Sequence, residues 1–347
     1  MTTASIIIRS KDEADRLRLT LTSLAGQTET AELIVVNDGS TDHTAWTLAE
    51  AAKVIPLAAI HHETAKGRSA AANAGAARAK GDILIFLDGD TLAAPDFVAC
   101  HLNAHAGPTR AIARGETYHL RGTRFFQDPE AGTPKSGEEA RVAALSEAER
   151  SRMCVTRNEI RTDFSAIHAR STPGIYPGAG PRLLFELEMQ ALREHPDCSV
   201  LWAAASGSNQ SIPRRDFEAS GGFDESLTIN EHRELALRLC RMGRAMIPAE
   251  GARSYHLTHR SGWRDPLTDH DWETIFYRSH PIPSVALLSV FWASLSAPKT
   301  FPLERRILSL PALEAAANRC RHMVGIENIR SAHFGNHDKP QPGDVMS

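Results

Sequence analysis

The sequence is poor in cysteine, and its cysteines are not arranged for cross-linking. There are five in 347 residues, and no two of them have the CxxC spacing. This pattern excludes both a disulfide framework and a zinc knuckle. We therefore expect a reducing compartment, the cytoplasm, with the protein either free there or bound to the membrane surface. The cysteines are Cys100, Cys154, Cys198, Cys240 and Cys320.

An excess of positive charge and a membrane-length apolar run are also missing. The net charge is −3 and the sequence pI is near 6.6, which argues against a nucleic-acid partner, since phosphate backbones select basic surfaces. Residues 285–297 are apolar but too short to span a bilayer, and we predict a buried helix there; a membrane-surface or partner-binding helix is the alternative. The N-terminus has no basic-then-apolar signal pattern, so we expect no transmembrane segment.

The first hundred residues alternate between strand and helix patterns. The strand patterns occupy residues 5–9, 33–36, 58–61 and 83–87, and the helical patterns 12–24, 44–52 and 69–79. Such alternation predicts an α/β fold with a doubly wound, Rossmann-like sheet. Ligands of these sheets bind outside the carboxyl ends of the strands, so residues 9–10, 37–40 and 88–90 are expected on one rim.

The rest of the chain has a different pattern. We interpret residues 121–205 as a polar central insertion with one amphipathic helix at 138–152. The later predicted elements are strands at 206–212, 245–247 and 252–256 and a long helix at 230–242. We therefore predict a first domain over residues 1–265 that contains the insertion, a C-terminal helical extension over 266–335 and a disordered tail over 336–347.

Two carboxylates directly follow the last of the early strand patterns, in Leu87-Asp88-Gly89-Asp90. Carboxylates two residues apart at a strand end can reach one divalent cation, and oxygen ligands suit Mg²⁺ or Mn²⁺. The alternative is a strand-terminating turn, in which Asp and Gly are common anyway. Asp38, after the second strand pattern, also allows two interpretations. Its carboxylate can accept a hydrogen bond from a nucleobase, or the residue can belong to a turn before a helix.

With these motifs in place, the chain resembles the family 2 glycosyltransferases, which have the GT-A fold. Residues 35–42 have the letters VVNDGSTD where the family usually has VVDDGSTD, and residues 66–90 contain the family's Gly, Ala-Asn-Ala-Gly, Gly-Asp and Asp-x-Asp in order. Residues 207–225 resemble its acceptor-side segment. The resemblance covers residues 5–91 and 206–259 and leaves out 121–205 and the end of the chain.

The resemblance implies a metal-dependent transfer of a sugar from a nucleotide-diphosphate sugar, usually a UDP-sugar, to an acceptor. By position, Asp38 would contact the nucleobase, and Ser10 and Asp12 would line the nucleoside pocket. Arg68 would lie near the base or the diphosphate. Asp88 and Asp90 would hold the ribose and a Mn²⁺ or Mg²⁺ ion, and Asp90 would be the direct metal ligand.

One departure from the family pattern concerns the general base. The family usually has Glu-Asp-x-Asp/Glu-Leu here, and the Asp of the first pair takes the proton from the acceptor. Residues 231–235 have the letters EHREL instead, so His232 occupies the base position. Either His232 takes the proton at neutral pH, or Glu231 does, or the enzyme is not a simple inverting one.

A last cluster follows the predicted closing strand, where the resemblance suggests His256 and His259 as further ligands of the metal. Neutral imidazole is a sound ligand for Mn²⁺, although the sequence has 16 histidines and a single one means little. Arg264 is well shaped to grip a diphosphate.

Two other functions compete with the glycosyltransferase. A nucleotidyltransferase typically has an N-terminal glycine-rich loop, and residues 5–13 contain no glycine. A non-catalytic nucleotide-sugar-binding protein is supported by the change at His232, but the intact Asp88-Gly89-Asp90 argues against it. The acceptor stays open among saccharides, small molecules, peptides and lipid-linked sugars, and the C-terminal helices can pair two copies into a homodimer.

Overall fold

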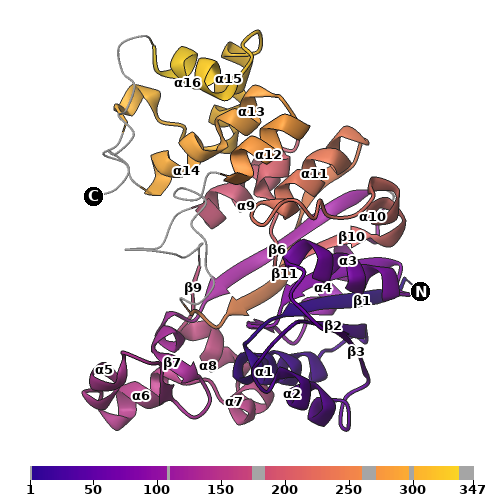
Figure 1. Ribbon diagram of the computed structural model, residues 1–347, viewed down its shortest axis with the longest axis vertical. Coiled ribbons are helices and arrows are strands. Elements are labelled where there is room, and N and C mark those ends of the chain that lie inside the picture. Colours follow the sequence, from indigo (N-terminus) through magenta and orange to yellow (C-terminus); the bar gives the residue numbers. More distant parts are fainter. Residues whose placement is uncertain (1, 108–109, 174–183, 260–270, 297–300, 336–347) are drawn as a thin grey trace.

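The computed structural model describes residues 2–107, 110–173, 184–259, 271–296 and 301–335. Its centre is a nine-stranded mixed sheet in the order β3-β2-β1-β4-β10-β6-β11-β5, with β9 beside β6 (Figure 1). The first four strands pair in parallel, which confirms the doubly wound pattern of the early sequence. They are β1 (Ala4–Ser10), β2 (Glu32–Asp38), β3 (Leu57–His62) and β4 (Ile83–Asp88).

The second half of the sheet mixes the two directions. β10 (Gln210–Pro213) runs antiparallel to both β4 and β6 (Ala111–His119), and β5 (Thr91–Ala93) runs antiparallel to β11 (Ala245–His256). The short β9 (Thr172–Pro173) pairs with β6. β10 begins at Gln210, so the strand predicted from residue 206 was placed too early.

The two predicted closing strands are in fact one strand, β11, with an irregular segment inside it. Its parallel pairing with β6 shifts register between Pro248 and Arg253. Pro248 has no N–H to donate to a neighbouring strand, and Gly251 has a φ of +79°. The bulge therefore interrupts the hydrogen bonding without ending the strand.

Helices cover both faces of the sheet, because successive strand side chains point to opposite sides. Ile7 and Ile34 pack into the core beneath α3, α9 and α11, whereas Ile8 and Val35 pack into the core beneath α1, α2 and α4. The helices on the first face are α3 (Arg68–Arg78), α9 (Leu184–Glu194) and α11 (Glu231–Arg241), and α10 (Arg214–Ser220) lies beside them. Those on the second face are α1 (Ala14–Ala25), α2 (Thr44–Ala51) and α4 (Phe97–Ala104).

The second part of the predicted insertion contributes α9 to the core beside the sheet, whereas its first part, up to residue 169, holds short elements at one end of the molecule (Figure 1). They are β7 (Phe126–Asp128), β8 (Thr133–Pro134), α5 (Glu139–Ala143), α6 (Glu147–Met153), α7 (Arg157–Thr162) and α8 (Phe164–Ala169). The single helix predicted over 138–152 is wrong: α5 and α6 are separate. Ser146 and Glu149 form a capping box that starts a new helix at this point.

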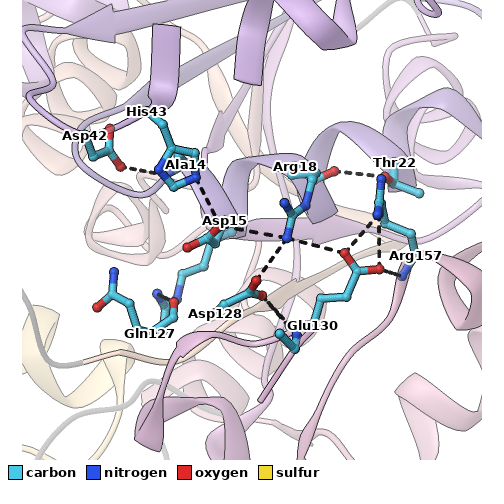
Figure 2. A network of polar contacts seen from close by, with 12 residues as sticks. Ala14, Asp15, Arg18, Thr22, Asp42, His43, Gln127, Asp128, Glu130 and Arg157 are labelled. Carbon is cyan, nitrogen blue, oxygen red and sulfur yellow. Dashed lines mark hydrogen bonds and ion pairs between the residues drawn. The ribbon is translucent and has the colours of Figure 1, made fainter. Parts of the chain in front are cut away.

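Arginines of α1 attach this insertion to the sheet domain. Arg18 Nη2 lies 3.1 Å from Asp128 Oδ2 and 3.4 Å from Glu130 Oε2, and Figure 2 shows both ion pairs as dashed lines. The neighbouring Arg16 is buried and donates from Nη2 to the Phe126 carbonyl at 2.8 Å and from Nε to the Leu257 carbonyl at 3.2 Å. Arg16 thus connects the insertion with the segment that follows β11.

The C-terminal part is helical, as predicted, and continues the core on the α9–α11 side. Residues 285–296 lie in two buried helices, and among the described residues no helix is long and apolar enough to cross a membrane. The helices are α12 (Asp271–Ser279), α13 (Pro283–Ala286), α14 (Leu288–Ser296), α15 (Leu310–Arg319) and α16 (Ile326–Phe334), with 3₁₀ turns at Arg121–Phe125, Leu201–Ala204 and Leu303–Arg305. The predicted disordered tail lies outside the described residues.

Candidate active site

A pocket of about 400 Å³ opens where β1, β2 and β4 end side by side. This is the rim expected for a ligand of a doubly wound sheet. The pocket is lined by Arg9, Ser10, Lys11, Glu13, Asp38, Ala65, Gly67, Arg68, Ala71, Asp88, Asp90, His256 and His259. Seven predicted site residues are in this set; Asp12, Glu231 and His232 are not, and Arg264 lies outside the described residues.

Asp90 and two histidines converge at one end of the pocket. Asp90 Oδ2 lies 3.1 Å from His256 Nε2 and 2.6 Å from His259 Nε2. Burial opposes the charged form of Asp90, but His256 and His259 outweigh it and hold the pKa of the carboxyl well below its usual range. Burial likewise acts to lower the pKa of His256, and Asp90 raises it instead.

These three side chains can hold a metal ion. One carboxylate oxygen and two imidazole nitrogens lie within 4.8 Å of one another. One oxygen and two nitrogen donors suit Mn²⁺ and related divalent cations. The hydrogen bond from the backbone N–H of Leu257 to the Asp90 carbonyl, 2.8 Å long, fixes the histidine segment against the aspartate.

Asp88 lies outside this group and has another partner. Its Oδ1 accepts a hydrogen bond from Arg9 Nε at 2.7 Å, and Arg9 Nη1 donates to Glu231 Oε1 at 2.9 Å. Burial acts to lower the pKa of Arg9, but Asp88 and Glu231 outweigh it and raise that pKa. The carboxylates of Asp88 and Glu231 thus share one guanidinium.

Both candidates for the general base are held by arginines. Burial acts to raise the pKa of Glu231, but His232, Arg68 and Arg9 together lower it, so this fully buried carboxylate is a weak base. Burial lowers the pKa of His232 to about 4, so its imidazole is neutral at pH 7. His232 Nε2 lies 2.8 Å from Arg233 Nη1, and an arginine can only donate, so this nitrogen is the acceptor.

The residues predicted to contact the nucleoside also fix the loops in which they lie. Asp38 accepts hydrogen bonds from His62 Nδ1 at 2.7 Å and from the backbone N–H groups of Lys66 and Gly67 at 2.8 and 2.9 Å. Asp12 has a φ of +54° and accepts from the backbone N–H of Thr41 at 2.6 Å. Asp38 lines the pocket while it fixes the loop before α3.

The sequence patterns placed Arg9 on this rim but missed Lys11 and Glu13 as lining residues. Burial, followed by the neighbouring Asp90 and Asp88, raises the pKa of Glu13 well above its usual range. A Cβ atom at Gly89 would lie 2.6 Å from Glu13 Oε1, so a side chain at the middle residue of the Asp-Gly-Asp motif would displace Glu13. The position of these residues after β1 was the available signal; their contact with residues 88–90 was not visible in the sequence.

The mixed sheet, with acidic residues at its strand ends, has the GT-A fold, which two solved structures share. TarS from S. aureus, solved with UDP-GlcNAc, has the same fold with a TM-score of 0.51 at 14% identity, over 82% of this chain and 66% of that one. GalNAc-T7, solved with UDP, GalNAc and Mn²⁺, gives a TM-score of 0.51 at 18% identity, over 82% and 51%. At these identities the similarity is one of fold.

Sequence comparisons show which proteins the chain is similar to. Residues 5–158 match the family model described as Glycosyl transferase family 2. The validoxylamine A glucosyltransferase of Streptomyces hygroscopicus subsp. jinggangensis (strain 5008) is 29% identical over 302 residues, 83% of this chain and 63% of that protein. The uncharacterized glycosyltransferase YfnE of Bacillus subtilis (strain 168) is 37% identical over 114 residues, 32% and 29% of the two chains. Residues 5–158 are thus similar to glycosyl transferase family 2, and the chain spans less than two thirds of either relative.

Proposed function

We propose that this protein is a metal-dependent glycosyltransferase that moves a sugar from a nucleotide-diphosphate sugar, with UDP as the nucleotide, to an acceptor. The observation that carries the proposal is the pocket itself. It joins the Asp90, His256 and His259 cluster with the cationic side chains of Lys11 and Arg68 at the carboxyl ends of the strands. Cation ligands beside basic groups suit a metal–diphosphate pair.

In this proposal different residues of the pocket bind the metal ion, the diphosphate and the nucleoside. Asp90, His256 and His259 hold Mn²⁺ or Mg²⁺, which when bound neutralises the charge that builds up on the leaving diphosphate. Arg68 is the first residue of α3, so its guanidinium and the N-terminus of that helix both favour an anionic group. Asp38 holds the loop that carries Lys66 and Gly67 against the nucleoside side.

We assign the proton transfer to His232. Glu231 is bound to Arg9 and is fully buried, whereas His232 is neutral and its side chain keeps 13% exposure. The nitrogen that would take the proton accepts a bond from Arg233, so catalysis requires that bond to open as the acceptor arrives. The same contact favours one alternative function, a nucleotide-sugar-binding protein without turnover.

The relatives suggest where to look for the donor and the acceptor. TarS was solved with UDP-GlcNAc and GalNAc-T7 with UDP, and the validoxylamine A glucosyltransferase matches 83% of this chain. UDP-glucose with validoxylamine A is therefore the first pair to assay, ahead of peptide and lipid-linked acceptors. A cytoplasmic location, free or at the membrane surface, and a homodimer through the C-terminal helices are part of the proposal; light scattering tests the dimer.

The decisive experiment is a thermal-shift screen of UDP-, GDP-, dTDP- and CMP-sugars, each with Mn²⁺ and with EDTA. A ligand that binds only the folded state raises the melting temperature. We expect a shift with UDP-sugars that is largest with Mn²⁺ and much smaller in EDTA, followed by release of UDP when acceptor is added. Binding without turnover on any acceptor class would favour the binding protein, and release of pyrophosphate from a nucleoside triphosphate would favour a nucleotidyltransferase.

A further inference from the structure

Arg9 occupies a central place in the pocket that the proposed reaction does not by itself explain. It lies in β1, whose residues are all buried, keeps only 8% exposure and still lines the pocket. Its guanidinium donates to three different segments: from Nε to Asp88, from Nη1 to Glu231 and from Nη2 to the carbonyl of Gly207 at 2.9 Å. A planar guanidinium can satisfy such a set of acceptors, and an ammonium group cannot.

The consequence of these bonds is a particular balance of charge. Glu13, Asp88 and Asp90 place three carboxyl groups on the rim of one pocket, which by themselves would attract any divalent cation. Arg9 removes Asp88 from this set by pairing with it, at 2.7 Å. Glu231 is fully buried on α11 and does not line the pocket. Its ion pair with Arg9 fixes the guanidinium in that position.

We propose that Arg9 is a specificity-determining positioning residue that makes the pocket select a metal–diphosphate pair over the free divalent cation. The inference rests on the proposed function, because it takes the diphosphate as one half of the ligand. Arg9 neutralises Asp88 and so lowers the affinity for a cation that arrives alone. Its positive charge at the pocket wall raises the affinity for the anionic diphosphate.

The test uses two probes on the full chain: Mn²⁺ alone, and UDP in the presence of EDTA, each titrated by calorimetry. Arg9→Met should bind Mn²⁺ about three- to tenfold more tightly than the wild type and UDP weaker by a similar factor, because one positive charge is lost beside both ligands. Arg9→Lys keeps the positive charge but not the three hydrogen bonds of the guanidinium, so its affinity for Mn²⁺ should lie between those of the wild type and Arg9→Met.

Glu231→Gln gives an independent variant with the opposite sign. It removes a negative charge and leaves Arg9 paired with Asp88 alone, so Mn²⁺ should bind less tightly and UDP more tightly than in the wild type. This variant also keeps the inference testable if Arg9→Met does not fold, which its thermal melting will show.

The matched control is Arg238→Met. Arg238 also bridges α11 to another segment, with Nη2 2.7 Å from Glu234 Oε2 and 2.6 Å from the Gly222 carbonyl, but it does not line the pocket. Neither probe should change affinity in this variant. If Arg9 acted on stability alone, Arg9→Met would bind both Mn²⁺ and UDP less tightly than the wild type. That result, or an unchanged affinity for Mn²⁺, overturns the inference. If the wild type binds no UDP, GDP or dTDP, with or without Mn²⁺, the proposed function fails instead, while the Mn²⁺ titrations still test Arg9.

Discussion

The guanidinium of Arg233 lies over the indole ring of Trp292, 4.8 Å from the ring centroid. Arg233 belongs to α11, next to His232, whereas Trp292 belongs to α14 in the C-terminal helical part. Arg233 also donates to Glu188 Oε1 at 3.1 Å and to the Ala203 carbonyl at 2.8 Å. The C-terminal helices therefore help to position the arginine that contacts the proposed base.

The first prediction follows from this contact. Trp292→Leu removes the aromatic face beneath Arg233 and should lower turnover about fivefold or more, since a desolvated cation–π contact is worth about 2 kcal/mol. The affinity for UDP with Mn²⁺ should not change, because Trp292 does not line the pocket. Trp292→Phe keeps an aromatic face, so its turnover should lie between those of the wild type and Trp292→Leu. A parallel loss of nucleotide affinity in Trp292→Leu would show that the change spreads beyond α11.

The second prediction concerns the metal cluster. Asp90→Asn keeps the size of the side chain but removes the anionic ligand between His256 and His259, so Mn²⁺-dependent binding of UDP should fall about 100-fold. Melting temperature should change little, because a carboxylate at the pocket rim is not part of the apolar core. Asp82→Asn is the control: this exposed carboxylate bonds Thr3 far from the pocket. Unchanged UDP affinity in Asp90→Asn would remove Asp90 from the metal site.

The third prediction separates the two candidates for the base. His232→Ala should lower turnover about 10²- to 10³-fold at pH 7.5, the range lost with a general base, while Glu231→Gln should cost less than about tenfold. Glu231 is already bound to Arg9 and is a weak base, so its charge matters for position and not for taking the proton. Initial rates at saturating donor check this. The reverse order of severity would assign the base to Glu231.

Much of this fold was visible in the sequence, because local patterns determine it. The β-branched and apolar runs of β1, β2, β3 and β4 and the helical spacing between them predicted the parallel half of the sheet. The turn residues after β2 and β4 marked the carboxyl ends of the strands, where the pocket lies. The strand β6, with Gly115 and several polar side chains in nine residues, gave no such pattern and was missed.

The rest of the site could not be predicted, because it depends on contacts between distant segments. Arg9 and Glu231 are 222 positions apart, and nothing in either local sequence shows that one guanidinium joins them. The resemblance placed Asp88 and Asp90 together on a metal, but it could not show that Asp88 is paired with Arg9. Burial decides these partners, and burial is a property of the folded chain.

The fourth prediction tests the close packing at the Asp-Gly-Asp motif. A Cβ atom at Gly89 would lie 2.6 Å from Glu13 Oε1 and 2.8 Å from Ser10 Oγ, so Gly89→Ala must push both side chains in the pocket. We expect a loss of about 1–3 kcal/mol in the free energy of unfolding and a weaker affinity for UDP with Mn²⁺. Gly26→Ala, whose Cβ would meet only the Ser23 carbonyl at 4.0 Å, is the control and should change neither quantity.

The last prediction concerns acid stability. His101 is fully buried, with Nδ1 2.9 Å from Ser211 Oγ and Nε2 2.9 Å from Asn209 Oδ1, and burial lowers its pKa from 6.5 to about 3. Below pH 6.5 the unfolded chain binds a proton here that the folded chain does not, so stability is lost as the pH falls. The expected slope for this residue is about 1.4 kcal/mol per pH unit between pH 6 and about 4.

The difference between wild type and His101→Gln isolates this contribution, because other titrating groups act on both. Urea unfolding at pH 4.5, 5.5 and 6.5 should show a less stable variant at pH 6.5 whose stability falls less steeply toward acid than that of the wild type. Equal slopes in wild type and His101→Gln would mean that His101 becomes charged inside the folded protein, which its full burial and the apolar surroundings of α4 argue against.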